Sequence, residues 1–336
     1  MTKVTIVIPA RNEEKYIEQC IFSFLNQTYN QNLITILVCD GLSDDRTREI
    51  VSNIAQNHSN VQLLDNQKQT TPYALNLGIT SSSDDIVIIF GAHAKADSAY
   101  VQECIDTFKI DPKIACVGGV IENIHENKVS AIISGAMSSQ FGVGNAHFRT
   151  GLKEGFVDTV AFGAYKRSLF DEIGMFDETL TRNQDDEFNY RLHKFGFKIY
   201  LNKKIKCQYF VRGSMRKLFR QYFQYGFWKV VVNKKHSTVT SVRQLAPLFF
   251  VSFLMFFPFL LIISVRFWII YVFILALYFI IISTASLRQN PIRFWFTSML
   301  SFLTLHLAYG SGYLWALINW PFLLKNHSEK HAEITR

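Results

Sequence analysis

Two short polar segments follow apolar runs that are typical of buried strands. Arg11 and Glu13 come after the first run, and Asp40 follows the second. An arginine can bind a phosphate or a base, and a carboxylate can accept hydrogen bonds from a ribose or a base. Since no Gly-rich turn follows the first run, a dinucleotide fold is disfavoured. These residues predict a nucleotide held by side chains, although the same pattern is also an ordinary polar helix start.

A third group of candidate residues is the acidic cluster Asp185, Asp186 and Glu187, which opens a helix-like segment. The helix dipole favours ionised carboxylates there, and an ionised carboxylate can accept a proton from a substrate. The plain alternative is an acidic first turn without a catalytic role.

The elements that would position these residues alternate between strand-like and helix-like patterns. Strands are predicted at 4–9, 33–39, 61–64, 85–90 and 114–120, and helices at 12–24, 45–56, 72–78 and 185–194. Such alternation predicts an α/β fold with a mostly parallel, Rossmann-like sheet, whose ligand site lies at the carboxyl ends of the strands. The glycine-rich segment 142–155 is interpreted as a mobile loop over the site.

The charges and apolar residues of the 336-residue chain are unevenly distributed. Residues 1–187 contain 15 Lys+Arg and 25 Asp+Glu, whereas residues 188–328 contain 18 basic residues and no acidic one. Uncharged stretches predict about three membrane spans, at 245–265, 267–287 and 296–318. Buried core helices, the alternative, would be shorter and have a polar face.

These patterns predict four regions: a catalytic domain at 1–212, a basic aromatic interfacial helix region at 213–243, a transmembrane region at 244–324 and a tail at 325–336. Basic residues beside spans indicate anionic membrane lipids as a partner and argue against nucleic acid. Three spans would place the basic tail outside, against the positive-inside rule, so one span could instead be re-entrant or interfacial.

The cysteines and the N-terminus indicate where the first domain resides. The five cysteines stand singly, without the spacing of a zinc or disulfide framework, which suits a reducing compartment. Met1 to Lys3 lead directly into a strand-like segment, so no signal peptide is expected. The chain is therefore expected to be an integral protein of the cell membrane with a cytoplasmic catalytic domain.

In combination, these segments resemble family 2 glycosyltransferases of the GT-A fold. The family pattern is a strand, Pro-x-x-Asn-Glu, a second strand and an Asp-rich turn, which correspond here to 9–13 and 40–45. The resemblance is greatest to succinoglycan-type exopolysaccharide glucosyltransferases, through 141–145, 162–165 and 183–192. It covers roughly residues 1–235.

The resemblance implies roles for individual residues. The implied catalytic base is Asp185, which takes the proton of an acceptor hydroxyl as it displaces the nucleotide diphosphate with inversion. Gln184, Asp186 and Arg149 are implied at the acceptor or diphosphate side. The residues implied around the nucleotide are Pro9, Ala10, Arg11, Glu13, Asp40, Lys68 and Ala92.

Two departures from the family pattern concern the metal and the acceptor. Near relatives have Asp-Ala-His after the fourth strand, where this chain has Gly91-Ala92-His93. His93 remains as the implied metal ligand, and imidazole favours Mn²⁺ over Mg²⁺. The segment 224–228 lacks the Arg of the Gln-x-x-Arg-Trp motif of processive members, which favours transfer of a single sugar.

The resulting hypothesis is an inverting hexosyltransferase. It would transfer a sugar, glucose or another hexose, from a UDP-sugar to a lipid-linked saccharide or polysaccharide acceptor in exopolysaccharide or cell-surface glycan synthesis. Two alternatives remain: a catalytically silent membrane scaffold, suggested by Gly91, and a metal-independent transferase in which Lys68 or Arg149 stabilises the diphosphate.

Overall fold

The computed structural model describes residues 1–211, 213–240, 242–262 and 264–323. The chain divides into two compact units, each built from two segments. The sheet unit comprises residues 1–123 and 146–210, and the helical unit comprises residues 124–145 and the chain from 211 onward. The expected tail at 325–336 lies outside the described residues.

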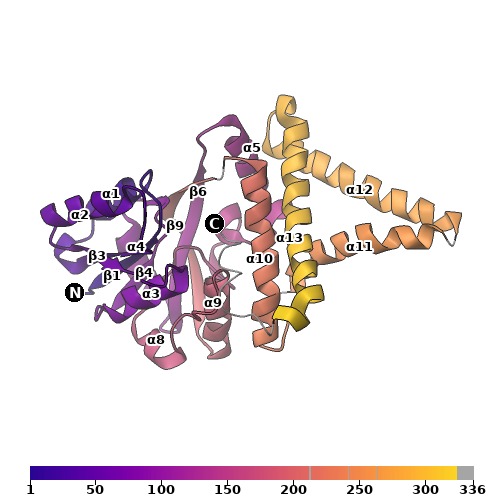
Figure 1. Cartoon of the computed structure of the whole chain (residues 1–336). Helices are drawn as coiled ribbons and strands as arrows, with labels where there is room; N and C mark the ends of the chain where they lie inside the picture. Colours follow the sequence, from indigo (N-terminus) through magenta and orange to yellow (C-terminus); the bar gives the residue numbers. More distant parts are fainter. Residues whose placement is uncertain (212, 241, 263, 324–336) are drawn as a thin grey trace. The chain divides into compact units, whose positions relative to one another are not determined.

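The sheet unit is organised around one mixed sheet (Figure 1). Its strands are β1 (Val4–Ala10), β2 (Ile34–Asp40), β3 (Val61–Asp65), β4 (Ile86–Ile89), β5 (Ala94–Ala96), β6 (Ile114–Ile124), β7 (Gly155–Val157), β8 (Ala164–Lys166) and β9 (Lys198–Phe210). Their order is β3-β2-β1-β4-β8-β6-β9-β5, with β7 beside β9. The first four neighbours pair in parallel, as predicted, whereas β8 pairs antiparallel with β4 and β6.

The helices of the sheet unit cover the two faces of this sheet. They are α1 (Ile17–Leu25), α2 (Thr47–Asn57), α3 (Thr71–Thr80), α4 (Tyr100–Phe108), α7 (His147–Thr150), α8 (Ser168–Ile173) and α9 (Gln184–Lys194), with a short 3₁₀ turn η1 (Gln31–Leu33). Helix α3 lies very close to β1, because Gly78 leaves room for Val7: an added Cβ would be 2.4 Å from a Val7 methyl group. On the same face, α3, α8 and α9 share one core cluster with Val7.

An aromatic cluster fixes α9, the helix of the acidic residues. Phe188, which is fully buried, contacts Phe170 at 5.1 Å, Phe176 at 4.6 Å and Tyr165 at 5.5 Å between ring centroids. Aromatic pairs of this kind add to the stability gained from burial alone. Because Phe188 lies three residues after Asp185, the first turn of α9 is held in place from the core.

The helical unit consists of helices from two separate segments of the chain. They are α5 (Lys128–Met137), α6 (Gln140–Val143), α10 (Met215–Lys235), η2 (Val242–Leu245), α11 (Ala246–Leu261), α12 (Val265–Gln289), η3 (Ile292–Phe294) and α13 (Trp295–Leu323). The predicted loop at 142–155 thus begins within α6 and contains α7. In α6, Phe141 packs against Phe302, and its carbonyl oxygen lies 2.9 Å from Nε2 of His306.

Glycines bring the backbones of α10 and α13 together. A Cβ added to Gly226 would lie 2.0 Å from the Tyr309 oxygen, and one added to Gly312 would lie 1.9 Å from the Phe223 oxygen. Small residues allow such close helix contacts. The segment predicted as an interfacial helix therefore packs one face against α13.

Two helices of the described chain are long and apolar enough to cross a membrane. They are Val242–Leu260 and Val265–Gln289, which overlap the first two predicted spans. The third predicted span, 296–318, falls within α13, which does not meet the same criterion.

Candidate active site

The polar loops predicted to bind a nucleotide meet at one edge of the sheet. Ala10 of β1 pairs with Asp40 of β2, and Asp40 pairs with Asp65 of β3, so all three strands end side by side. The chain leaving β4 reaches the same edge, since the Phe90 N–H donates to the Val7 carbonyl at 3.0 Å. This is the edge at which parallel α/β sheets bind ligands.

Hydrogen bonds make the loops after β1 and β2 one rigid assembly. The Asn12 N–H donates to Ser43 Oγ at 2.9 Å, and the Asp44 N–H donates to Asn12 Oδ1 at 3.1 Å. The Glu13 N–H donates to Thr47 Oγ1 at 2.8 Å. Asn12 has a φ of 55°, a conformation that asparagine tolerates better than most residues. Arg11 and Glu13 are thereby presented from a fixed backbone.

Asp40 occupies the predicted position but is completely buried. Its carboxylate accepts hydrogen bonds from Arg48 Nη1 at 2.8 Å and from the Ser43 N–H at 3.0 Å, and Ser43 Oγ donates to its other oxygen. These bonds to Asp40 and a second carboxylate, Asp65, raise the pKa of Arg48. Asp40 thus fixes the turn after β2.

Arg11 has an unused hydrogen-bond donor at this edge. Its side chain lies over Gly41, whose added Cβ would be 3.4 Å from Arg11 Cδ, and its buried Nη1 has no hydrogen-bond partner. A buried unsatisfied donor is costly unless a ligand engages it. Of the other predicted nucleotide residues, Lys68 is exposed in the turn after β3, Pro9 is half-buried, and Ala10 and Ala92 are buried.

His93 is paired with Glu13 across the edge. Its Nδ1 lies 3.2 Å from Glu13 Oε1, and both side chains are about one-quarter exposed. Metal-binding histidines usually donate their other ring N–H to a carboxylate, which orients the ring. The His93 ring also contacts Tyr209 at 5.2 Å, and the Arg149 guanidinium lies 5.5 Å from the same Tyr209 ring. Arg149 is thus placed near the predicted metal ligand.

An aromatic ring occupies the space beside Gly91. A Cβ added to Gly91 would lie 2.8 Å from Phe162 Cε1. Phe162 has a φ of 51°, its ring lies 4.7 Å from that of Phe90, and its carbonyl accepts a hydrogen bond from the Tyr100 hydroxyl. The Phe162 ring therefore occupies the space that a carboxylate side chain at position 91 would need.

The three acids of α9 have different environments. Glu187 is buried and forms two 2.9 Å hydrogen bonds with Arg191, so its role is structural. Asp185 is exposed and accepts a hydrogen bond from the Asp186 N–H at 2.9 Å. Before them, Gln184 keeps a buried Oε1 without a hydrogen-bond partner. Asp185 is therefore the more accessible carboxylate at the start of α9.

Tyr165 and Asn189 hold α9 beside β8. The Tyr165 hydroxyl donates to Asn189 Oδ1 at 3.3 Å, and Asn189 Nδ2 donates to Thr159 at 2.9 Å. Burial raises the pKa of Tyr165 well above its usual range, with smaller contributions from Cys116 and Asp185. Tyr165 therefore remains protonated and can keep this bond.

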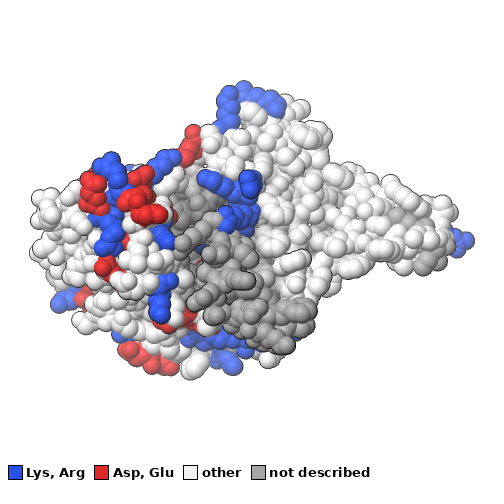
Figure 2. All heavy atoms as spheres, in the orientation of Figure 1, with Lys and Arg blue, Asp and Glu red and all other residues white. Residues whose placement is uncertain are grey.

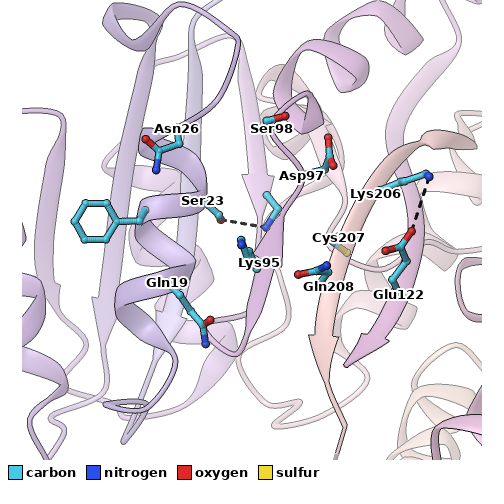
Figure 3. A pocket seen from close by; sticks show the side chains of 12 residues that line it. Gln19, Ser23, Asn26, Lys95, Asp97, Ser98, Glu122, Lys206, Cys207 and Gln208 are labelled. Atoms are coloured by element: carbon cyan, nitrogen blue, oxygen red, sulfur yellow. Dashed lines mark hydrogen bonds and ion pairs between the residues drawn. The ribbon is translucent and has the colours of Figure 1, made fainter. Parts of the chain in front are cut away.

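A separate hollow of about 430 Å³ lies between α1 and strands β5, β6 and β9 (Figure 3). Lys95 and Lys206 lie in it with Asp97 and Glu122, and Lys206 Nζ is 3.8 Å from Glu122 Oε1. None of the predicted site residues lines it. The candidate active site is the strand edge with Arg11, Glu13 and His93, and the role of Asp185, which lies at the exposed start of α9, remains a prediction.

Sequence reasoning missed two residues of this site and one contact. The sequence pattern includes Phe162 only within the motif 162–165 and predicts no role for Tyr209. The Glu13–His93 contact joins residues 80 positions apart, of which Glu13 is predicted to bind the nucleotide and His93 the metal. Only the absence of a carboxylate at Gly91 signalled that something else fills this space.

Comparisons with known proteins identify the family of this chain. The profile of Glycosyl transferase family 2 matches residues 5–174. A dolichyl N-acetyl-α-D-glucosaminyl phosphate 3-β-D-2,3-diacetamido-2,3-dideoxy-β-D-glucuronosyltransferase from Methanococcus voltae is 36% identical over 243 residues, 70% of this chain and 75% of that protein. Succinoglycan biosynthesis protein ExoA from Rhizobium meliloti (strain 1021) is 28% identical over 249 residues, 74% of this chain and 75% of that protein.

A solved structure has a similar fold. The mannosyltransferase PcManGT from Pyrobaculum calidifontis, in complex with GDP-Man and Mn²⁺, superposes with a TM-score of 0.63 and 18% identity, covering 94% of this chain and 87% of that one. The predicted GT-A fold is thus confirmed, and so is the predicted relation to exopolysaccharide transferases. The chain is a glycosyltransferase and belongs to glycosyltransferase family 2.

Proposed function

We propose that this chain transfers a hexose from a UDP-sugar to a lipid-linked saccharide or polysaccharide, with inversion, on the cytoplasmic side of a membrane. The observation that carries the proposal is the Glu13–His93 pair at the edge where the strand ends meet. The carboxylate of Glu13 orients this imidazole, and Arg11, two residues earlier in the chain, has a buried donor without a hydrogen-bond partner.

A divalent cation at this edge would be held by the His93 imidazole, whose ring the Glu13 carboxylate orients. Among the described residues, no three His, Cys, Asp or Glu side chains form a metal-binding group. His93 would therefore be the protein ligand, and an imidazole ligand favours Mn²⁺ over Mg²⁺. A bound cation would neutralise charge on the leaving diphosphate.

The protein residues then have distinct roles. Arg11 and Lys68 would contact the nucleotide, Pro9, Ala10 and Ala92 would form the pocket wall, and Asp40 would position the loop. Arg149, fixed over Tyr209, would add positive charge near the diphosphate.

Asp185 would act as the general base. The acceptor hydroxyl oxygen attacks the anomeric carbon, the bond from that carbon to the diphosphate oxygen breaks, and its electron pair leaves with the diphosphate. Asp185 takes the hydroxyl proton in the same displacement. Gln184 and Asp186, on either side of it, would contact the acceptor.

The proposed acceptor class rests on one relative. The M. voltae relative is named for a dolichyl-linked acceptor, which supports a lipid-linked acceptor here. The solved neighbour contains GDP-Man, so the UDP preference must be tested directly.

Calorimetric titration of the detergent-purified chain with UDP and GDP provides this test. Each nucleotide is titrated with Mn²⁺, with Mg²⁺ and with a chelator. The proposal predicts UDP binding that is tightest with Mn²⁺ and is weakened in Arg11→Ala. Tighter GDP binding would overturn the donor class, and no binding of either nucleotide would favour the silent scaffold.

A further inference from the structure

The surface of α11 and α12 is almost entirely apolar. Phe249, Phe259, Ile269 and Phe273 are each about two-thirds exposed, and few residues of either helix are buried. Figure 2 shows this part of the helical unit without charged atoms except at its tip. Exposed apolar surface of this extent needs a nonaqueous partner.

The two helices pack against each other as an antiparallel hairpin. Near its base, Phe250 stacks on Tyr278 with ring centroids 4.2 Å apart, and nearer the tip Phe257 stacks on Tyr271 at 5.7 Å. Figure 1 shows α11 and α12 meeting at a turn away from α13. The two apolar segments contain 19 and 25 residues, within the range of about 17–25 residues that crosses a hydrocarbon layer.

Helix α13 is not free to cross a membrane by itself, because α10 accompanies it along most of its length. Ser301 donates to Met215 near the start of both helices, and Asn233 donates to the Tyr313 hydroxyl at 2.9 Å towards their ends. Near the C-terminal end, Lys234 Nζ lies 5.7 Å from the Trp320 ring. Any placement of α13 relative to the membrane therefore also fixes the placement of α10.

Helix α10 is too strongly charged to cross a bilayer. Its basic residues are Arg216, Lys217, Arg220, Lys229, Lys234 and Lys235, and it has no acidic residue. Most of them are exposed, near both ends of the helix. Intramembrane charges are expensive, whereas basic residues beside an anionic leaflet are stabilised. The α10–α13 pair therefore belongs at the membrane surface.

The remaining basic residues orient the hairpin. Lys234, Lys235 and Arg243 precede α11, Arg288 and Arg293 lie at or after the end of α12, and Arg266 lies in the first turn of α12, at the tip of the hairpin. By the positive-inside rule, the base of the hairpin faces the cytoplasm and the turn faces outward. Exposed Trp295 and Trp315 on α13 suit a location at headgroup depth.

We propose that this chain crosses the membrane twice, through the α11–α12 hairpin, and that α10 and α13 lie together on the cytoplasmic surface against anionic lipid headgroups. The third apolar segment is a surface helix held by α10. Residues 211–214, between β9 and α10, are too few to cross a bilayer.

Cysteine labelling with a membrane-impermeant maleimide tests this topology. All five native cysteines are buried, so the native chain should react little with the maleimide and the labelling of a single added cysteine can be detected. The variants are Thr238→Cys before the hairpin, Ser264→Cys at its turn and Asn319→Cys near the end of α13. Labelling is compared in intact cells stripped of their outer layers and in inverted membrane vesicles.

Two crossings predict that Thr238→Cys and Asn319→Cys react in inverted vesicles and that Ser264→Cys reacts in the stripped cells. Three crossings would make Asn319→Cys react together with Ser264→Cys, which overturns the proposal. If all three sites react only in inverted vesicles and alkaline carbonate extracts the protein, the hairpin does not cross. None of these outcomes depends on the transferase reaction.

Discussion

At the scale of single residues, the Glu13–His93 contact determines how the site could hold a metal. Nδ1 of His93 lies 3.2 Å from a Glu13 oxygen. A carboxylate in this position fixes the ring and raises its basicity as a ligand. Glu13 is therefore a positioning residue in our account, in addition to its proposed place near the nucleotide.

Glu13→Gln is expected to weaken Mn²⁺ binding in the presence of UDP by about 10- to 100-fold, the usual effect of losing such a partner. Glu18→Gln, an exposed residue of α1, is the matched control and should have no effect. Calorimetry measures both affinities. Unchanged Mn²⁺ affinity in Glu13→Gln and in His93→Ala would exclude His93 as the ligand.

Gly91 and Phe162 are expected to behave as one energetic unit. Gly91→Asp places a Cβ 2.8 Å from the Phe162 ring, which should cost about 1–3 kcal/mol of stability. Phe162→Ala removes the clash, so the double variant should lose less stability than the sum of the two single variants. Chemical denaturation of all four proteins measures this coupling, and strictly additive losses would contradict it.

At the scale of elements, the long parallel strands can be predicted from the sequence, whereas the strands of three residues and their antiparallel pairings cannot. The predicted strand 4–9 is β1 at Val4–Ala10, because a β-branched apolar run marks a buried parallel strand. Strands β5, β7 and β8 contain three residues each, too few to show a period of two. The antiparallel half of the sheet could therefore not be predicted from pattern alone.

The α10–α13 contact makes an element-scale prediction. Gly226→Ala puts a Cβ 2.0 Å from the Tyr309 oxygen, so the helices must separate. We expect a loss of about 1–3 kcal/mol in the helical unit, seen as a lower thermal midpoint in detergent. Phe219→Ala, on an exposed face of the same helix, is the control. Equal midpoints for both variants would argue against this packing.

At the scale of the whole molecule, the chain alternates between its two units. Residues 124–145 belong to the helical unit although they lie between strands of the sheet unit. Within the helical unit, Asn290 contacts the Ile132 oxygen of α5, and Phe141 of α6 contacts Phe302. The sequence pattern does not predict that residues 124–145 belong to the helical unit. A helix that faces lipid and a helix that packs on other helices are both rich in apolar residues, so composition does not distinguish them.

Truncation after residue 210 is therefore expected to give an aggregation-prone protein. It removes the partners of α5 and α6 and leaves their apolar side chains exposed. Replacing Ile132 and Phe141 by Ser in the truncated chain should raise its soluble fraction, whereas Ile110→Ser, at an exposed site of the sheet unit, should not. Sedimentation after expression measures this fraction, and a fully soluble truncated chain would contradict the division.

The central claim is that the chain transfers a sugar with Asp185 as the base. The most direct measurement is the rate of sugar transfer by Asp185→Asn in membranes, together with its UDP affinity. Our account predicts a rate about 10²- to 10⁴-fold lower, with UDP affinity unchanged. Asp171→Asn, an exposed acid on α8, should keep the full rate. Transfer at the normal rate by Asp185→Asn would contradict the account.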